Sequence, residues 1–188
     1  MTMIQIAGTS GSGKSTLVRR VMQLYGPRIA VRIPDRKQPY GYMLPRQEGD
    51  GPSLGVIGHY ETACGGCDTI TNMDSIFDAA RRTHNSGMDV LFEGLLISAG
   101  FNRTFALHQD GLPVHVIGLD VPLDECLQSI NQRRWAKNPE KPPVNPKNTE
   151  QKFKGVRSTL KKLQDHGVSV EWHSRDSAYE RIKELLHV

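Results

Sequence analysis

Cysteine is scarce in this sequence of 188 residues, and long apolar runs are missing. The cysteines, Cys64, Cys67 and Cys126, form an odd and sparse set that gives no disulfide framework, so a reducing compartment is the simplest expectation. No stretch reaches the roughly 20 apolar residues of a membrane-spanning helix. Neither a basic leader nor a cleavage region precedes the first apolar run. We therefore expect a cytoplasmic protein without a membrane partner.

The chain also lacks internal repeats and any large region appended to a single domain. Its 188 residues suit one compact α/β domain, spanning 1–188, with a sizeable core. Lys and Arg number 24 against 20 Asp and Glu, which gives a formal charge of +4 and a pI near 9. This balance suits a polyanionic substrate and equally any enzyme that binds phosphate groups. No segment indicates an obligate protein partner.

The most informative stretch is GTSGSGKS at residues 8–15. It matches the phosphate-binding pattern G-x-x-x-x-G-K-[ST], follows the apolar run at 3–7 and leads into a helical pattern. Its glycines let backbone N–H groups converge on phosphate oxygens, and the helix N-terminus adds positive potential. We expect Lys14 to reach the β- and γ-phosphates and Ser15 to bind magnesium. The predicted nucleotide-binding residues are Gly8, Ser10, Gly11, Ser12, Gly13, Lys14, Ser15 and Thr16.

This motif predicts a nucleoside triphosphate ligand, and the chain length indicates how the ligand is used. Assembly-type ATPases need more sequence, whereas a small phosphotransferase fits onto one sheet and a mobile lid. We therefore expect a kinase that uses ATP and Mg²⁺. ATP is chosen over GTP because no N-K-x-D-like segment for reading guanine is present.

Apolar runs alternate with amphipathic helical patterns along the chain. Strands are predicted near residues 3–7, 29–33, 88–92, 114–119 and 168–172, and helices near 14–25, 70–85, 123–136, 149–166 and 176–187. This alternation predicts an α/β fold of three layers, in which helices cover both faces of a five-stranded parallel sheet. Two segments interrupt the rhythm: residues 34–69, expected to bind the acceptor, and 133–150, expected to form a lid.

Two carboxylates stand at the ends of predicted strands. Asp35 follows the strand near 29–33, which we expect to lie beside the phosphate loop, so that Asp35 would orient or deprotonate an acceptor hydroxyl. Glu93 ends the apolar run at 88–92, as the carboxylate of a Walker B segment that holds magnesium does. Glu93 is also an alternative base, with Asp35 assisting. Either carboxylate could instead be a surface residue at a strand end.

The segment from Gly118 to Arg134 runs from a core strand through Pro122 into a helix that ends in paired arginines. It resembles the strand–Pro–helix–Arg segment of P-loop kinases related to polynucleotide kinase and zeta toxins. This resemblance implies the three-layer P-loop kinase fold and makes Arg133 and Arg134 lid residues that close over the transferring phosphoryl group. A guanidinium can stabilise charge on the equatorial oxygens. For one of the two, a basic helix end that complements the helix dipole is the alternative.

Residues 58–69 combine glycines with polar, aromatic and thiol side chains in the region expected to bind the acceptor. Tyr60 would stack on a base while His59 and Glu61 supply hydrogen bonds, and Arg36 is a further predicted substrate contact. A Tyr and a His packed under a long loop would give the same pattern.

A metal site is an alternative for the same segment, with His59, Cys64 and Cys67 as a zinc knuckle. A single C-x-x-C lacks the second ligand pair of a closed zinc site. A redox dithiol is no better supported, because the motif does not stand at a helix start. A tight turn or a substrate loop is the favoured interpretation.

Near the C-terminus, residues 172–177 join the last predicted strand to the last helix. In P-loop kinases this connection commonly touches the adenine, which makes Ser174 and Arg175 candidates for a nucleotide contact. A capping turn, in which Ser174 or Asp176 accepts hydrogen bonds from helix N–H groups, is an equal and compatible interpretation.

The motifs specify phosphoryl transfer and leave the acceptor open. Residues 59–67, the basic character and the compact size resemble bacteriophage P-loop kinases that phosphorylate 5-hydroxymethyluracil in DNA. That resemblance implies a partner DNA containing the modified pyrimidine, and location in the host cytoplasm. The target nucleotide would leave the stack to reach the pocket. A set of basic residues would lie along DNA phosphates or form a solvated helix face: Lys152, Lys154, Arg157, Lys161 and Lys162.

Other acceptors, and one other class of function, fit the same motifs. A free nucleoside, a nucleoside monophosphate or a small metabolite would use the same loop and lid, and a polynucleotide 5′-kinase would act on unmodified ends. A non-catalytic nucleotide switch would bind triphosphate to expose or hide a partner surface. Such a switch would require neither paired lid arginines nor Asp35.

Overall fold

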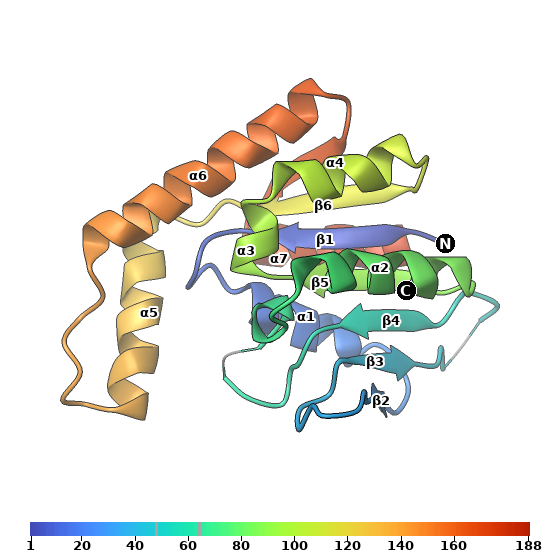
Figure 1. Ribbon diagram of the computed structural model, residues 1–188, viewed down its shortest axis with the longest axis horizontal. Coiled ribbons are helices and arrows are strands. Elements are labelled where there is room, and N and C mark those ends of the chain that lie inside the picture. The colour runs from blue at the N-terminus through green and yellow to red at the C-terminus, as the bar shows by residue number, and fades with distance from the viewer. Residues whose placement is uncertain (48, 64) are drawn as a thin grey trace.

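A mixed β-sheet forms the centre of the molecule. The computed structural model describes residues 1–47, 49–63 and 65–188, and in these residues the strands follow the order β2-β3-β4-β5-β1-β6-β7 (Figure 1). The strands are β1 (Met3–Ala7), β2 (Ile29–Val31), β3 (Gly41–Leu44), β4 (Leu54–Ile57), β5 (Asp89–Glu93), β6 (Val114–Leu119) and β7 (Ser169–His173). Neighbours from β4 to β7 pair in parallel, whereas β3 is antiparallel to both β2 and β4. The predicted α/β fold with a parallel core is confirmed.

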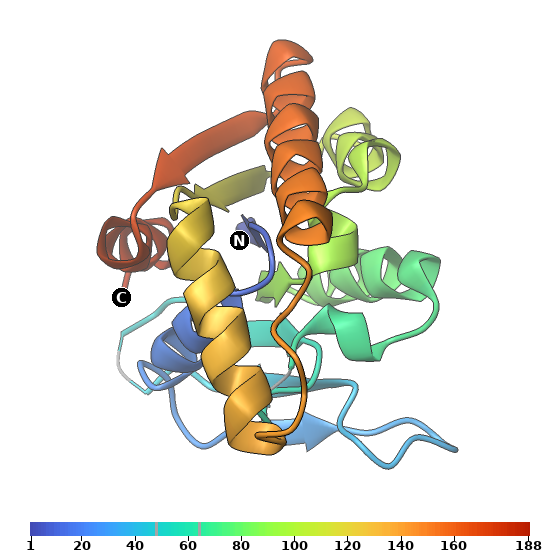
Figure 2. The same ribbon diagram turned by 90° about the vertical axis from the view of Figure 1, so that its left-hand side faces the viewer.

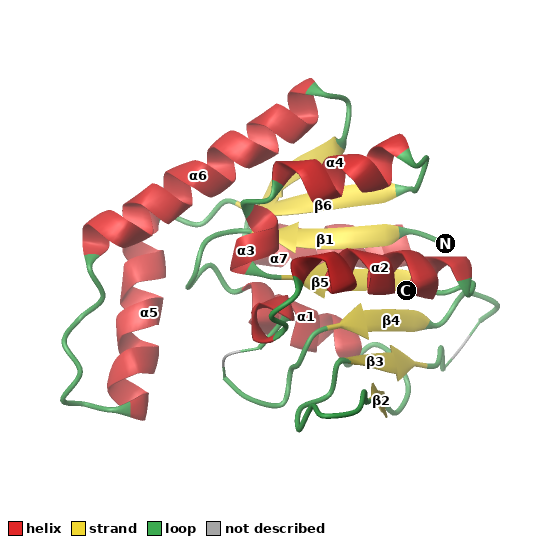
Figure 3. Cartoon of the chain, viewed as in Figure 1, coloured by secondary structure: helices red, strands yellow, loops and turns green. Residues whose placement is uncertain are grey.

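Helices cover both faces of this sheet, as predicted (Figures 2 and 3). They are α1 (Lys14–Met22), α2 (Met73–Asn85), α3 (Leu95–Ser98), α4 (Phe101–Gln109), α5 (Leu123–Lys137), α6 (Pro146–Asp165) and α7 (Arg175–Leu186), with the 3₁₀ turn η1 (Cys67–Thr69). Successive strand residues point to opposite faces. In β1, Ile4 and Ile6 therefore join the core beneath α1 and α7, while Met3 joins the core beneath α2, α4 and α6. Among the described helices, none has the length and apolar character that a membrane crossing needs.

The sheet is larger than the predicted five strands. In the described chain, β3 and β4 form inside the segment 34–69, β4 pairs with β5, and β5 lies beside β1, so the strand near 29–33 does not lie beside the phosphate loop as predicted. That strand, β2, lies at the sheet edge instead. Each new strand has four residues, too few to show an alternating pattern among flanking Gly and Pro. Helices α3 and α4 are likewise additions to the predicted set.

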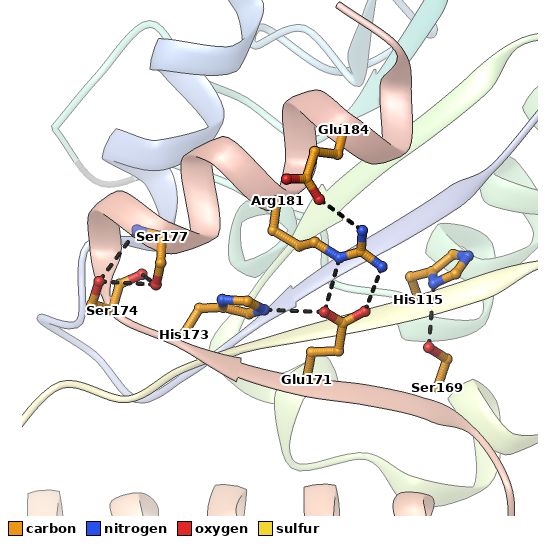
Figure 4. A network of polar contacts seen from close by, with 8 residues as sticks. All are labelled: His115, Ser169, Glu171, His173, Ser174, Ser177, Arg181 and Glu184. Atoms are coloured by element: carbon orange, nitrogen blue, oxygen red, sulfur yellow. Dashed lines mark hydrogen bonds and ion pairs between the residues drawn. The ribbon is translucent and has the colours of Figure 1, made fainter.

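Polar contacts fasten the last strand to the last helix (Figure 4). Glu171 of β7 accepts two hydrogen bonds from the Arg181 guanidinium of α7, at 2.9 and 3.0 Å, and lies 3.1 Å from His173 Nε2. The Arg181 guanidinium lowers the pKa of this carboxyl group. Ser174 caps α7 by accepting a first-turn N–H at 3.2 Å, which confirms the capping interpretation. These contacts hold the first turn of α7, where Arg175 lies.

Helix α5 and the first part of α6 form an arm beyond the carboxyl edge of the sheet, and the later part of α6 packs on the core (Figures 1 and 2). Residues 138–145 connect the two helices. The Arg134 guanidinium donates to the Pro142 carbonyl at 3.0 and 3.3 Å, and the Val144 N–H donates to Asn131 Oδ1 at 2.8 Å. The predicted lid segment thus contains the end of α5, a braced connection and the start of α6.

Candidate active site

A cavity of about 610 Å³ lies at the carboxyl edge of the sheet, between the phosphate loop, α5 and η1. Ligands of open α/β sheets bind at this edge. The lining combines phosphate-loop residues with side chains from several other elements. Among the described residues it comprises Ser10, Gly11, Gly13, Lys14, Ser15, Thr16, Leu17, Arg19, Arg20, Ala63, Gly65, Asp68, Thr69, Glu93, Ser129, Arg133, Arg175 and Asp176.

Two glycines of the phosphate loop adopt backbone geometry that disfavours any side chain. Gly11 has φ +81°, and a Cβ there would lie 2.3 Å from the Cys126 carbonyl oxygen. Gly13 has φ +100°, and its Cβ would lie 3.2 Å from Arg175 Nε. Gly13 is also the N-cap of α1 and supplies no side-chain cap. The first N–H groups of α1 are therefore available to an anion.

Two buried hydroxyls of this loop fit a phosphate ligand. Thr9 Oγ1 and Ser12 Oγ are buried and lack hydrogen-bond partners within the described part of the chain. An unpartnered buried hydroxyl costs free energy, which a phosphate oxygen accepting its hydrogen would recover. The loop residues thus fit the predicted triphosphate, and Thr9 joins the residues that the motif identified.

The Lys14 side chain is hydrogen-bonded to the backbone of its own phosphate loop. Its ammonium donates to the carbonyl oxygens of Gly8 at 2.8 Å and Thr9 at 3.0 Å, and the residue is 6% exposed. Burial lowers the pKa of Lys14, and the nearby Glu93 carboxylate acts in the opposite direction. To reach β- and γ-phosphates, Lys14 must exchange these carbonyls for phosphate oxygens.

Ser15 and Glu93, the predicted magnesium ligands, are in direct contact. The Ser15 hydroxyl donates to Glu93 Oε1 at 2.7 Å, and Glu93 is 1% exposed. Burial raises the pKa of the Glu93 carboxyl group, opposed by the Lys14 ammonium and by the Ser15 hydrogen bond. A hydroxyl and a carboxylate are hard oxygen ligands of the kind that Mg²⁺ takes while it keeps several waters. The pair therefore fits magnesium.

One side of the cavity, here called the donor side, is formed by α5 and α7. Arg175 donates from Nε to the Ser12 carbonyl at 3.0 Å, and its Nη1 pairs with Glu125 Oε2 at 3.0 Å. Arg20 pairs with Asp176 at 3.1 Å on the same side. Arg175 thus joins the phosphate loop to α5, a position suited to the predicted nucleotide contact.

The other side, here called the acceptor side, is formed by the acceptor loop, residues 58–69. His59 and Gly66 pair through backbone hydrogen bonds of 3.3 and 2.7 Å. Gly66 has φ +80°, and a Cβ there would lie 2.1 Å from Glu93 Oε1. Arg19 of α1 donates to a carbonyl of this loop at 3.0 Å. The loop therefore packs directly on the Ser15–Glu93 pair.

The single turn of α3 connects the acceptor loop to the phosphate loop. Asp68 accepts the N–H groups of Leu95 and Leu96 at 2.9 and 3.2 Å, and so caps the start of α3. At the end of α3, the Ser98 hydroxyl oxygen accepts the Gly8 N–H at 3.2 Å. Asp68 also lines the cavity. The sequence pattern does not identify Asp68 as a site residue, because its place depends on a contact across 27 residues.

The predicted substrate contacts of the acceptor loop lie outside the described cavity lining. Tyr60 is 2% exposed and its ring centroid lies 6.3 Å from that of Tyr42, so the prediction that it stacks on a base is wrong. His59 is buried, with Nε2 3.1 Å from Thr62 Oγ1. Glu61 is exposed. The alternative of a Tyr and a His packed under a long loop is the one that the structure supports.

Asp35 and Arg36 lie on the connection between β2 and β3. Because β2 is an edge strand, Asp35 does not lie beside the phosphate loop as predicted. Asp35 is exposed, its backbone φ is +62°, and it is not among the described residues that line the cavity. Arg36 reaches inward, and its guanidinium donates to the Thr69 carbonyl and hydroxyl, each at 2.8 Å. Since Thr69 lines the cavity, Arg36 supports its rim.

The paired arginines of α5 have different positions. Arg133 lines the cavity, as does Ser129 one turn earlier on the same helix face. Arg134 instead holds the Pro142 carbonyl, outside the described lining. Arg133 is therefore the arginine placed to act on a phosphoryl group, and Arg134 braces the lid connection.

The zinc alternative receives no support from the described residues. Cys64 lies outside them. Cys67 is buried, and its Sγ donates to the Ile57 carbonyl at 3.4 Å. Within the described ranges, no group of three or more metal-ligating side chains is found.

Several basic residues of α6 are engaged by carboxylates. The pairs are Lys154 with Glu150 at 2.6 Å, Arg157 with Asp120 at 2.7 Å and Lys161 with Asp165 at 3.5 Å. These pairs favour the solvated helix face over a tract dedicated to DNA phosphates.

Similarity to known proteins adds to this geometry. No family model matches the chain. A protein of Pseudomonas phage PaMx11 named 5-hmdU DNA kinase is 56% identical over 185 residues, which cover 98% of this chain and 96% of that protein. A protein of the same name from Delftia phage PhiW-14 is 28% identical, over 98% of this chain and 72% of that protein. Among solved structures, deoxyadenosine kinase from M. mycoides covers 99% of both chains with a TM-score of 0.52 at 14% identity, which shows a shared fold.

Proposed function

The chain belongs to the 5-hmdU DNA kinase family, and we propose that it transfers the γ-phosphate of ATP to the hydroxymethyl group of 5-hydroxymethyldeoxyuridine in DNA. The observation that carries this proposal is the 56% identity over 98% of the chain. The cavity supports it, because a nucleotide-binding side and an acceptor side meet at the Ser15–Glu93 pair. The reaction belongs in the host cytoplasm, where phage DNA is accessible.

We assign ATP to the donor side. The N-terminus of α1 and Lys14 would hold the β- and γ-phosphates, with Arg175 beside the phosphate loop. Magnesium, held by Ser15 and Glu93, would supply charge neutralisation on these phosphates. Arg133 would donate to the equatorial oxygens of the phosphoryl group during transfer.

We assign the general base to Asp68. Glu93 accepts the Ser15 hydroxyl and Asp35 lies outside the described lining, whereas Asp68 lines the cavity from the acceptor loop, and two N–H groups of α3 orient its carboxylate. The hydroxymethyl oxygen forms a bond to the γ-phosphorus while the bond from phosphorus to the β–γ bridging oxygen breaks. The hydroxyl proton passes to Asp68, and ADP leaves.

Transfer of γ-labelled phosphate tests the proposal. The acceptors are a duplex with one 5-hydroxymethyldeoxyuridine, the same duplex with thymidine, and a panel of free nucleosides and nucleotides, with nuclease digestion to locate the label. Label on the hydroxymethyl base of the first duplex is the expected result. Label confined to free nucleosides or to 5′ ends would refute this acceptor, and no transfer to any acceptor would favour a nucleotide switch.

A further inference from the structure

The edge of the sheet carries an exposed apolar stripe. Ile29, Val31 and Ile33 alternate along the chain and are 55%, 37% and 42% exposed. Alternate residues of a strand point to the same face, so Ile29 and Val31 of β2 share one face, and Ile33 follows them in the connection after the strand. Pro34, also exposed, follows at its end. Exposed apolar groups gathered in this way mark surfaces that contact a partner.

The Ile33 end of this stripe lies at the same sheet edge as the cavity. Since β3 is antiparallel to both β2 and β4, β2 runs in the same direction as β4 and β5. The connection that follows β2, residues 32–40, therefore emerges at the carboxyl edge; it is the light-blue loop at the lower right of Figure 2. Arg36 ties this connection to Thr69 on the cavity rim, through two hydrogen bonds of 2.8 Å.

Positive charge surrounds the apolar tip of the connection. Arg32 and Lys37 flank Ile33 and Pro34, against the single acidic residue Asp35 in the segment, while Arg36 is held by Thr69. The Arg32 guanidinium donates to the Lys37 carbonyl at 3.1 Å, which closes the connection into a turn. Cations around an apolar tip match duplex DNA, because phosphates attract the cations and apolar side chains enter between base steps.

The side chains assigned to the γ-phosphate and to magnesium are buried where they line the cavity. Lys14 is 6% exposed and Glu93 is 1% exposed. The major groove is about 12 Å wide and 8.5 Å deep, so a group on C5 of a stacked pyrimidine remains between the two backbones. Enzymes with enclosed sites extrude the target nucleotide, and extrusion leaves a gap in the stack.

We propose that Ile33 and Pro34 form a wedge that enters duplex DNA at the gap left by the extruded nucleotide. Arg32 and Lys37 contact the flanking phosphates, and the bonds between Arg36 and Thr69 set the distance from the wedge to the cavity. This inference rests on the proposed function. The competing hypothesis is that a second copy of the chain, and not DNA, covers the stripe. The test below distinguishes DNA from a second copy.

The test compares Ile33→Ser with Ile29→Ser, a matched control at the far end of the same stripe. Rates are measured on one sequence in three forms: a paired duplex, the single strand, and a duplex with a mismatch opposite the target. Ile33→Ser should lower kcat/KM about tenfold or more on the paired duplex and at most about twofold on the single strand, because a single strand needs no extrusion. The mismatched duplex should recover part of the loss. Ile29→Ser should leave all three rates unchanged.

A second readout follows extrusion itself. With 2-aminopurine beside the target, binding of the wild type should raise its emission, and Ile33→Ser should not. Equal losses on the paired duplex and the single strand, or no loss on the duplex, would overturn the wedge. Equal effects of both variants, with a change of oligomeric state in gel filtration, would assign the stripe to a second copy. A wild type that phosphorylates none of the three DNAs would instead refute the proposed function.

Discussion

Asp68 lines the cavity while both of its carboxylate oxygens accept N–H groups of α3. Asp35 is exposed on the connection between β2 and β3. We expect Asp68→Asn to lower kcat on the hydroxymethylated duplex by about 10²- to 10⁴-fold, because an amide takes no proton and its single oxygen keeps only one of the two N–H bonds at the start of α3. Asp35→Asn is the matched control and should keep its rate. The reverse pattern in steady-state kinetics would return the role of base to Asp35.

Glu93 makes stability depend on pH. Burial raises its pKa above the ordinary value of 4.5, so folding favours the protonated form. Its contribution to stability is therefore present below the unfolded pKa and is lost as pH rises through the higher folded pKa. We expect the melting temperature without nucleotide to fall over this window in the wild type, and less so in Glu93→Gln.

At neutral pH Glu93→Gln should melt higher than the wild type, by about 2–4 °C for each kcal/mol of stability gained, and should lose phosphoryl transfer. Thermal melts across pH measure this difference. Burial also raises the pKa of Asp89, so the evidence is the difference between the two proteins and not the wild-type curve alone. Superimposable pH curves would contradict the assignment to Glu93.

Some site residues could be predicted from sequence because their signal is local. The phosphate loop is a contiguous sequence pattern, and Glu93 is the residue that immediately follows an apolar run of strand type. Asp68 and the burial of Tyr60 could not be predicted in this way. Both depend on how the acceptor loop packs on β5, where Gly66 approaches Glu93 too closely for a side chain. That packing joins residues far apart in the chain.

Among the elements, α5 presents its paired arginines to different surroundings. Arg133 faces the cavity, and Arg134 holds the Pro142 carbonyl. Arg133→Ala should reduce kcat by about 10²- to 10³-fold, the usual loss for a donor aimed at transition-state charge. Arg134→Ala should cost clearly less, since it loosens the lid connection without removing that donor. Equal losses in the two variants would contradict this division.

Trp135 offers a probe of the same arm. It is 66% exposed near the end of α5, two residues beyond Arg133. We expect its emission to change when a non-hydrolysable ATP analogue and DNA bind together, because closure of the arm alters its surroundings. The sequence has one other tryptophan, Trp172, so the change should disappear in Trp135→Phe. An unchanged spectrum in the wild type would mean that the arm stays in place.

The long helices could be predicted because a periodic pattern repeats over several turns. The observed α2 (Met73–Asn85) and α7 (Arg175–Leu186) begin or end within a few residues of the predicted bounds. Strand order could not be predicted, because pairing depends on the whole fold and not on the strand itself. β2 was recognised as a strand, yet antiparallel β3 separates it from the parallel strands, and β3, β4 and β5 separate it from β1. The wrong position for Asp35 follows from that one difference.

Across the whole molecule, α3 links the acceptor loop to the phosphate loop: Asp68 caps its start, and Ser98 at its end accepts the Gly8 N–H. We expect DNA to raise the affinity for nucleotide, and nucleotide to raise the affinity for DNA by the same factor, within about 5- to 150-fold. Ser98→Ala should reduce both factors together. Calorimetric titration of each ligand with and without the other measures them. Coupling that is absent in the wild type, or unchanged in Ser98→Ala, would contradict this role.

The resting position of Lys14 has a consequence for fidelity. Water outnumbers every acceptor hydroxyl, so a kinase that readied its γ-phosphate on ATP binding alone would hydrolyse ATP between targets. Here the ammonium starts on the Gly8 and Thr9 carbonyls, and the backbone of Gly8 is held through α3 by the loop that receives the acceptor. We therefore expect the fold itself to restrain idle ATPase activity, so that a variant that severs this link should consume ATP without modifying DNA.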